Sequence, residues 1–550
     1  MPRTNADLTL ELLEAAGVDV IFTCPGTTEV PLLDASVRHR SPRFVLTTHE
    51  TATVSAADAY SRATGKLGVA LLHANVGLTN GLAMVEAARI GRSRVLVLNG
   101  TKPTSTRNRR GFTQTAESTA VAAPFVVQAT SVTSLTSVEA DIRQALQRLH
   151  NAPSGPVYLE LPQDLLAMPA SGGTAPVTFT RPATVADDAA IVAVASQLAD
   201  ARRVLVVAGS DLAAAGATPL AVELAESLGA PIMEAPWREL ERETVPTSHP
   251  SYAGLLSYGA HALEDAVIVI TGTPAFQEPD DGPGLLPPSA RVVHILDHAA
   301  DLMPGSTPLV GDYVPTLARL IAAVRRSAAD GRQAATERRQ FLAEVTAWHH
   351  DSLQQLGSPT RGDDGQLTVL ALAAELQVRP LPGPIVLDAV TATSTLFRLT
   401  PRGPGRELYA TGSGALGWGL GAAVGVAMAG RYDRVFGVVS DGVVQFGLPA
   451  LHTAVAEQLP VTFIVVNNQA YHAVALALRK FGGSAADNGC YPCTDLGGTD
   501  LTMVAAGFGL RATRVTSIDE LRAALDDQGS VEGPALIEVV VPADASNPAR

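Results

Sequence analysis

The 550-residue sequence has few cysteines, few aromatic residues and few charges. Aromatic residues make up 5% and charged residues 17% of the chain, and the only cysteines are Cys24, Cys490 and Cys493. An odd, small number of cysteines argues against a disulfide framework and indicates a reducing compartment, so we expect a cytoplasmic location. Cys490 and Cys493 have the spacing of a redox motif, but no second pair is present for zinc. We interpret them as two thiols of a loop.

The chain also lacks a surplus of basic residues and a long apolar run. Its formal net charge of −14 argues against binding to nucleic acid or to an anionic membrane surface. No apolar stretch is long enough and free enough of glycine and charge to span a bilayer, and we expect no signal peptide. Hydrophobic residues nevertheless make up 46% of the chain. That share predicts a large buried core, and the length predicts about three domains.

Short apolar runs alternate with helical segments along the chain. This alternation is typical of α/β domains with doubly wound, mostly parallel sheets. Joints rich in glycine, proline and threonine separate three such regions. We therefore predict three domains, at residues 1–170, 185–345 and 366–550. In the first domain the pattern predicts strands at 18–22, 44–47 and 69–72, then a glycine-rich turn before a helix at 81–90.

Two apolar runs in the last predicted domain end in oxygen-bearing side chains. Residues 435–439 and 461–466 have the composition of buried parallel strands, with a helical segment between them. Since both strands of a βαβ unit end at the same sheet edge, we expect Asp441 and Asn468 to lie side by side. Such oxygen ligands suit Mg²⁺ joined to a phosphate-bearing partner, and Gly442 would let the backbone turn closely beside it. The alternative is a turn whose polar ends are only solvated.

This stretch resembles the signature of thiamine diphosphate-dependent enzymes, in which Gly-Asp-Gly is followed at a fixed spacing by Asn-Asn. The spacing from Asp441 to Asn468 is 27 residues (468 minus 441), and Ser440 replaces the first glycine. The resemblance implies that Asp441, Asn468 and the Ala470 carbonyl bind Mg²⁺, which bridges to the diphosphate of the cofactor. The cofactor-binding residues implied in this stretch are Asp441, Gly442, Asn468 and Tyr471.

Glu50 follows the predicted strand at 44–47 and opens a helix. A carboxylate at this position could cap the helix, or it could be a buried acid with a raised pKa. The spacing from Glu50 to the glycine-rich segment after His73 resembles the pyrimidine-binding domain of the same enzymes. The resemblance implies that Glu50 binds the aminopyrimidine ring and drives its imino tautomer, which removes the proton from the thiazolium C2.

The run at 412–425 has small residues at helical spacing, which would also suit a tightly packed helix without a ligand. In the resembled family, a large apolar residue flanked by glycines holds the cofactor in a bent conformation, and Leu416 occupies that position. The Gly414 carbonyl matches the acceptor for the pyrimidine amino group. Thr391 and Thr393 match a loop that contacts the diphosphate, although their hydroxyls could equally cap a helix.

Within the thiamine diphosphate-dependent 2-oxo acid decarboxylases and carboligases, the chain resembles the benzoylformate decarboxylases over nearly its whole length. The segments that carry this resemblance are Pro25–Glu29, Leu72–Ala74, Gly155–Tyr158, Ser248–Pro250 and Gly272–Phe276. The resemblance implies that His73 relays protons to and from the substrate, although a lone histidine at a strand end is more often structural. Thr27 matches a serine that contacts the substrate.

One departure concerns a second active-site histidine, which the resembled family carries just after the position of Phe276. This chain continues with Gln277 and Glu278 instead, and His294 and His298 lie farther along. Without that histidine, a slowly protonated intermediate could attack a second carbonyl. Whether Glu278 or Asp280 replaces it stays open.

The resemblance implies thiamine diphosphate- and Mg²⁺-dependent decarboxylation of an aromatic or bulky 2-oxo acid to an aldehyde, through an enamine. The alternative is a carboligase, similar to acyloin or acetolactate synthases, that joins the enamine to a second carbonyl. A lesser alternative is a non-catalytic paralogue that binds the cofactor. The family also implies a homodimer or homotetramer whose active sites lie between the first domain of one subunit and the third of another.

Overall fold

The computed structural model describes most of the chain. The described residues are 2–107, 109, 111–113, 117–170, 183–209, 211–235, 245–256, 263–272, 286–327, 332–357, 367–529 and 531–542. Internal contacts divide the chain into two compact units. The first comprises Met1–Arg181, Gly383–Thr391 and Ser413–Ser546, and the second comprises Pro182–Pro382, Ala392–Gly412 and Asn547–Arg550.

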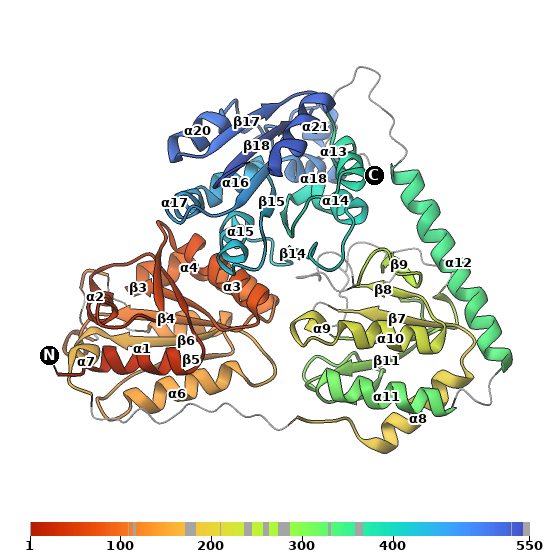
Figure 1. The fold of residues 1–550 in the computed structure, drawn as a ribbon, viewed down its shortest axis with the longest axis horizontal. Helices are drawn as coiled ribbons and strands as arrows, with labels where there is room; N and C mark the ends of the chain where they lie inside the picture. Colours follow the sequence, from red (N-terminus) through yellow and green to blue (C-terminus); the bar gives the residue numbers. More distant parts are fainter. Residues whose placement is uncertain are drawn as a thin grey trace. The chain divides into compact units, whose positions relative to one another are not determined.

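The N-terminal part of the first unit is built on a six-stranded parallel sheet with the order β2-β1-β3-β4-β6-β5. Its strands are β1 (Val20–Thr23), β2 (Arg43–Leu46), β3 (Gly68–His73), β4 (Val95–Thr101), β5 (Gln128–Ser131) and β6 (Val157–Pro162). Its main helices are α1 (Asn5–Ala15), α2 (Val30–Ser36), α3 (Glu50–Thr64), α4 (Ala74–Ile90), α6 (Val138–Leu149) and α7 (Gln163–Ala167). Figure 1 shows α1 and α6 on one face of this sheet, and α3 and α4 on the other.

Side chains alternate between the two faces of each strand, which explains this layering. In β3, Val69 and Leu71 join the apolar core beneath α1 and α6. The intervening Ala70 and Leu72 are equally buried but point to the opposite face. Parallel sheets covered on both faces therefore use nearly continuous apolar runs.

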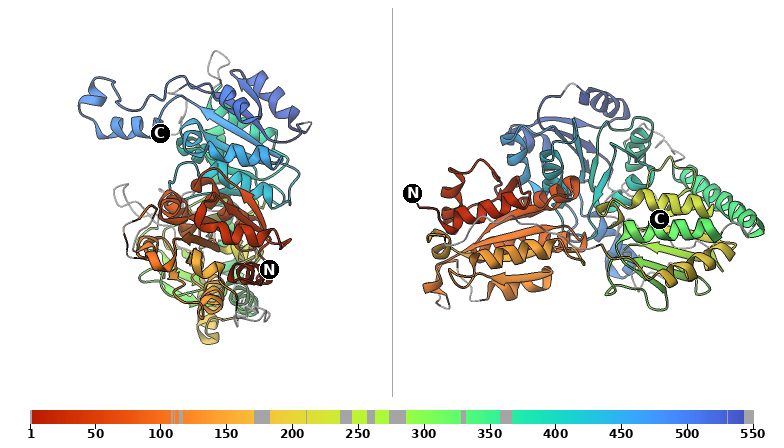
Figure 2. Two further views of the ribbon diagram at one scale, coloured as in Figure 1. Left: turned by 90° about the vertical axis from the view of Figure 1, so that its left-hand side faces the viewer. Right: turned by 60° about the horizontal axis from the view of Figure 1, so that its bottom comes forward.

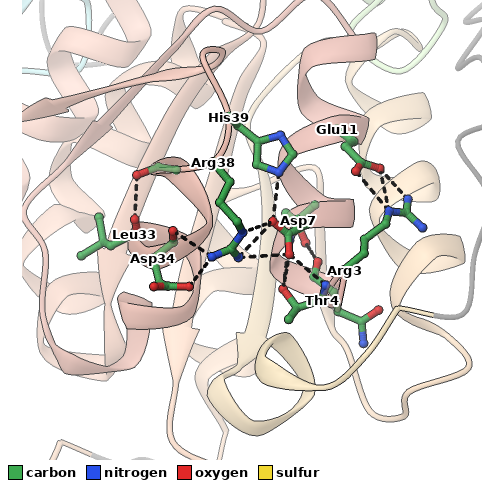
Figure 3. A network of polar contacts seen from close by, with 11 residues as sticks. Arg3, Thr4, Asp7, Glu11, Leu33, Asp34, Arg38 and His39 are labelled. Carbon is green, nitrogen blue, oxygen red and sulfur yellow. Dashed lines mark hydrogen bonds and ion pairs between the residues drawn. The ribbon is translucent and has the colours of Figure 1, made fainter. Parts of the chain in front are cut away.

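A polar network fixes the start of α1 (Figure 3). Asp7 is buried, and its carboxylate accepts hydrogen bonds from Thr4 Oγ1 at 2.7 Å and Arg38 Nε at 3.0 Å. His39 Nε2 lies 3.0 Å from the same carboxylate. Burial alone would raise the pKa of Asp7, but the bonds from Arg38 and Thr4 bring it well below its ordinary value. The network ties the chain after α2 to the first turn of α1.

The second unit contains a parallel sheet with the order β12-β11-β10-β7-β8-β9. Its strands are β7 (Val204–Ala208), β8 (Ile232–Glu234), β9 (Tyr252–Leu255), β10 (Val267–Thr271), β11 (Arg291–Leu296) and β12 (Thr307–Val310). Its helices include α8 (Asp188–Asp200), α10 (Thr218–Leu228), α11 (Tyr313–Ser327), α12 (Arg332–Gly357), α13 (Val369–Val378) and α14 (Thr393–Leu399). Helices α8, α10 and α11 cover one face of this sheet with an apolar core beneath them, and Phe341 and Val345 of α12 join the apolar cluster on the other face. Figure 2 (right) shows α12 as a long green helix.

The third sheet has the strand order β14-β13-β15-β16-β18-β17 and is also parallel where its register is defined. Its strands are β13 (Ile385–Asp388), β14 (Leu408–Ala410), β15 (Val435–Ser440), β16 (Val461–Asn467), β17 (Arg511–Val515) and β18 (Ala535–Val540). Its helices include α15 (Trp418–Met428), α16 (Asp441–Gly447), α17 (Pro449–Ala456), α18 (His472–Phe481), α20 (Leu501–Phe508) and α21 (Ile518–Asp526). Three parallel six-stranded sheets with interleaved helices confirm the predicted fold class, while the three predicted domain boundaries stay predictions.

Within the first unit, α15 packs closely against α3. Gly421 and Gly425 make this possible, because a Cβ at either position would overlap Ser55 or Ala56 of α3. In the run at 412–425, Gly421 and Gly425 therefore serve helix packing. This agrees with the interpretation of the run as a tightly packed helix.

The glycine-rich turn predicted before residue 81 is wrong, because α4 begins directly after His73, at Ala74. The glycines of this segment face α3 instead of forming a turn. A Cβ at Gly77 would lie 3.2 Å from Glu50 Oε1, and one at Gly81 would lie 3.2 Å from Val54 Cγ2. Glycine is needed here for close helix packing, which local sequence does not distinguish from a turn.

Candidate active site

Three adjacent strands of the first sheet end at one edge and lead into candidate residues. The strands are β2, β1 and β3 in spatial order. Thr27 follows β1, Glu50 follows β2, and His73 is the last residue of β3. Because parallel strands place their carboxyl ends at the same edge, the edge where α/β sheets bind ligands, the topology brings these residues to one region.

Glu50 is buried, with 7% of its surface exposed, and is the first residue of α3. The helix is capped instead by His49, whose side chain accepts the Thr51 N–H at 3.2 Å. The Glu50 carboxylate accepts a hydrogen bond from Asn80 Nδ2 of α4 at 3.1 Å. The side-chain cap of α3 is therefore His49, while Glu50 keeps the favourable position of a carboxylate in the first turn of the helix.

His73 is held by two residues that sequence patterns did not single out. Its Nδ1 lies 2.8 Å from Thr28 Oγ1 and 3.1 Å from Glu29 Oε2. Glu29 is fully buried, and burial raises the pKa of its carboxyl although contacts with Thr28 and His73 oppose that rise. A carboxyl behind Nδ1 orients the ring, because it leaves Nε2 as the nitrogen that can face a ligand.

Two glycines leave the space that this arrangement needs. A Cβ at Gly26 would overlap the His73 ring, and one at Gly100 would overlap the Glu29 carboxylate. The only sequence signal for Glu29 is its place at the end of the Pro25–Glu29 segment.

Thr27 and Cys24 complete this edge of the sheet. The Thr27 side chain is exposed, and its carbonyl accepts a hydrogen bond from Gln163 Nε2 at 3.2 Å. Thr28, and not Thr27, is therefore the threonine that contacts His73. Burial, together with the charges of Glu50 and Glu29, raises the pKa of Cys24 to about 11, so this residue is a neutral thiol.

The third sheet repeats this logic, since β13, β15 and β16 are spatial neighbours. Asp441 follows β15, and Asn468 follows β16. Asp441 is 4% exposed, and its Oδ1 accepts the Gly442 N–H at 2.8 Å. Its Oδ2 is buried and has no hydrogen-bond partner in the described part of the chain. Burial raises the pKa of Asp441, against the opposing effect of backbone N–H groups that include those of Gln469 and Ala470.

The residues after β16 surround this carboxylate. Asn468 Oδ1 accepts the Ala470 N–H at 3.0 Å, which shapes a turn around Gln469, whose φ is 57°. A Cβ at Gly442 would lie 2.9 Å from Tyr471 Cε1, so the aromatic ring packs directly on the glycine. A buried carboxylate oxygen without a hydrogen-bond partner fits a hard cation such as Mg²⁺.

The neighbouring Asn467 links β16 to β18, because its Nδ2 donates a hydrogen bond to Glu538 Oε1 at 2.6 Å. Among the described residues no cluster of three His, Cys, Asp or Glu side chains could hold a metal ion. Asp441 is a single carboxylate, so a metal ion bound there would need neutral oxygens as its other protein ligands.

The remaining predicted cofactor residues lie near β13 and before α15. Thr391 is half-buried in the short helix Val390–Ala392, and Thr393 is buried as the first residue of α14. The N-cap of α14 is Ala392 without a side-chain cap, so neither threonine caps this helix. Gly414 has a φ of 67° and open space where a Cβ would stand, and Leu416 nearby is half-buried.

His294 and His298 contact other residues of the second unit. His294 lies in β11, where its Nε2 is 2.9 Å from the Gly272 carbonyl and burial lowers its pKa. His298 lies between Asp297 and Asp301, at 2.7 and 3.0 Å. Glu278 and Asp280, the possible replacements for the missing histidine, lie outside the described residues.

The three cysteines are free thiols, and Cys490 and Cys493 are exposed. Their loop is hydrogen-bonded to the segment after β16, because the Tyr471 N–H donates to the Thr494 carbonyl at 2.8 Å. No helix among the described residues has both the length and the apolar character needed to cross a membrane.

Three domain families match the chain in succession. They are the N-terminal TPP binding domain of thiamine pyrophosphate enzymes at residues 3–121, the central domain at 191–320 and the C-terminal TPP binding domain at 388–539. The chain is 30% identical to a benzoylformate decarboxylase of Pseudomonas aeruginosa, with 98% of both chains covered. The chain therefore belongs to the thiamine pyrophosphate enzyme family, as predicted.

Other relatives carry different names. A probable acetolactate synthase large subunit of Methanocaldococcus jannaschii is 24% identical, and the match covers 98% of this chain and 92% of that protein. Among solved structures, a thiamine diphosphate-dependent 4-hydroxybenzoylformate decarboxylase of Rhodococcus jostii has a TM-score of 0.85 at 27% identity, over 98% of this chain and 99% of that one. The relatives thus include both decarboxylases and acetolactate synthases.

Proposed function

We propose that the chain is a thiamine diphosphate- and Mg²⁺-dependent decarboxylase of aromatic or bulky 2-oxo acids. The observation that carries this proposal is the placement of buried Glu50 and of the His73–Glu29 pair at the ends of neighbouring strands. An acid and an oriented imidazole at one sheet edge are the groups needed to activate a cofactor and to move a proton on a substrate.

The bound cofactor would supply the electron sink that allows a 2-oxo acid to lose CO₂. Asp441, Asn468 and the Ala470 carbonyl would hold Mg²⁺, which in turn fixes the diphosphate. The unpaired Oδ2 of Asp441 supports this assignment. The further residues proposed to contact the cofactor are Thr391, Thr393, Gly414, Leu416, Gly442 and Tyr471.

Glu50 would hydrogen-bond the aminopyrimidine ring and hold it in the reactive tautomer. His73 would carry a proton to and from the substrate at its Nε2, with Glu29 and Thr28 fixing the ring through Nδ1. Thr27, which is exposed at the same edge, would contact the substrate.

The decisive experiment incubates the purified protein with thiamine diphosphate, Mg²⁺ and a panel of 2-oxo acids that includes benzoylformate and pyruvate. We expect CO₂ and the matching aldehyde from benzoylformate, and much less from pyruvate. A Glu50→Gln variant should bind the cofactor but lose most of this activity. Absence of CO₂ release from every acid would instead favour the non-catalytic paralogue.

The active site is proposed to form between two subunits of a homodimer or homotetramer, with Glu50 from one and Asp441 from the other. Mixing inactive Glu50→Gln and Asp441→Asn chains tests this arrangement, because one of the two sites in each mixed dimer would then carry neither substitution. We expect activity to reappear after subunit exchange. Continued inactivity in verified mixed dimers would contradict a shared site.

Carboligation is the second candidate, favoured by the acetolactate synthase relatives and by Gln277 following Phe276 where the resembled enzymes have a histidine. Product analysis with an added aldehyde distinguishes the two outcomes, since a carboligase yields a hydroxyketone and a decarboxylase releases the aldehyde. The three free thiols support a reducing, cytoplasmic location, which fractionation of the native cells would test.

A further inference from the structure

A cavity of about 360 Å³ lies in the second unit, between β9, α12 and α14. Small-molecule sites in proteins have volumes of roughly 300–1,000 Å³, so its size suits a small ligand. Its lining includes Leu255, Trp348, His349, Leu353, Leu356 and Arg398. All of them belong to the second unit, whereas Glu50, His73 and Asp441 belong to the first.

Most of the cavity wall is apolar. Trp348, Leu353 and Leu356 recur along α12 at helical spacing, and Leu255 of β9 belongs to the same lining. Trp348 remains 42% exposed. A large aromatic ring that lines a cavity and stays this accessible can contribute its face to a ligand of similar flatness.

His349 brings a neutral polar group to this wall. Its ring meets Tyr252 edge-on, with centroids 5.4 Å apart, and Gly254 leaves the space for it because a Cβ there would overlap the ring. Burial, and secondarily the charge of Arg402, lowers the pKa of His349 to about 4. Its ring makes no hydrogen bond within the described part of the chain, so its nitrogens are available.

Arg398 supplies the charge. It lies in the last turn of α14 and is exposed, and it forms no hydrogen bond or ion pair with any described residue. The nearby Arg402 differs, because it is bound to Glu234 at 2.5 Å and to the Tyr252 hydroxyl at 2.7 Å. No acidic residue belongs to the described lining, so one guanidinium is left without a counter-charge.

We propose that this cavity binds a small aromatic monocarboxylate. The ring of the ligand would lie against Trp348 and the leucines. Its carboxylate would pair with Arg398 and accept a hydrogen bond from the neutral imidazole of His349. One uncompensated cation at the rim of an apolar cavity is complementary to a ligand that carries one anionic group on an apolar body.

The test measures the binding of radiolabelled phenylacetate by equilibrium dialysis. Phenylacetate is not a 2-oxo acid and cannot be decarboxylated by the proposed reaction. The full-length protein is used with and without thiamine diphosphate. We expect saturable binding that is the same in both samples. Arg398→Ala should weaken it at least about tenfold, because the ligand carboxylate would lose its charged hydrogen-bond donor.

Three controls make the result specific. Arg326→Ala removes another exposed arginine, in the last turn of α11, and should bind phenylacetate like the wild type. Leu356→Trp should fill the cavity and abolish binding, and the uncharged analogue phenylacetamide should not compete. Binding that survives both Arg398→Ala and Leu356→Trp, effective competition by phenylacetamide, or no saturable binding at millimolar ligand would each overturn the proposal.

Discussion

The buried link between α3 and α15 gives a quantitative prediction. Asp58 is fully buried, and its carboxylate accepts two hydrogen bonds from Arg62, both at 2.8 Å. The indole N–H of Trp418 donates to the same carboxylate at 2.8 Å, and the Arg62 guanidinium lies 5.1 Å from the centre of the Trp418 ring. This group therefore joins the helix that begins with Glu50 to the helix that follows Leu416.

Replacing Asp58 with alanine would remove the carboxylate that pairs with the buried Arg62 guanidinium. Breaking a buried ion pair in this way costs about 3–5 kcal/mol. The unpaired indole N–H adds about 1–3 kcal/mol. We expect the free energy of unfolding of this unit to fall by roughly 5 kcal/mol, allowing for the fact that neighbouring contributions do not simply add.

A matched control exists in the same unit. Arg143 and Glu139 of α6 form the same i,i+4 pair, but their side chains are 27% and 28% exposed. Glu139→Ala should therefore cost less than about 1 kcal/mol. The double variant Asp58→Ala/Arg62→Met should recover part of the lost stability, because it also removes the buried positive charge that Asp58 neutralises.

Urea denaturation followed by Trp418 fluorescence provides the assay, in a background where Trp237 and Trp348 are phenylalanine. The buried indole reports directly on the α3–α15 contact. If Asp58→Ala shifts the midpoint no further than Glu139→Ala, the ion pair does not hold these helices together and the reasoning fails. If the double variant loses as much stability as Asp58→Ala, the buried charge of Arg62 is not the cause of that loss.

Two further predictions concern the candidate site, and a third concerns Asp388 at the end of β13. Asp441→Asn should weaken Mg²⁺-dependent binding of thiamine diphosphate at least about tenfold, measured by titration calorimetry, because the proposed metal would lose its only carboxylate ligand from the protein; equal affinity would place the metal elsewhere. Gly26→Ala should lower kcat with little change in the melting temperature, since the new methyl displaces His73; a wild-type kcat would show that the ring position is unimportant. Burial raises the pKa of Asp388 to about 6 from 3.8, so the folded state holds this proton more tightly than the unfolded state and stability falls as the pH rises through that window. Asp388→Asn should flatten this fall in melting temperature between about pH 4 and pH 7, and an identical pH profile would contradict the assignment.

The sequence alone was sufficient for the elements that carry the site. The run at 435–439 became β15, and the run at 461–466 became β16, each within one residue at its end. Parallel pairing of Ser440 with Val466 then places Asp441 beside the residues after β16, as the βαβ pattern predicts. These predictions worked because an apolar run, a crossover of suitable length and the rule of common strand ends are all local or topological properties.

Only the tertiary structure decided which side chains meet across the sheet edge and between helices. Glu29 lies 44 residues before His73, and Asp58 lies 360 residues before Trp418, so no local pattern relates either pair. The glycines at 77 and 81 looked like a turn because glycine permits both turns and close helix contacts. Which of these a glycine provides depends on the neighbouring helix, and the position of that helix is set by the strand order and the packing of the whole sheet.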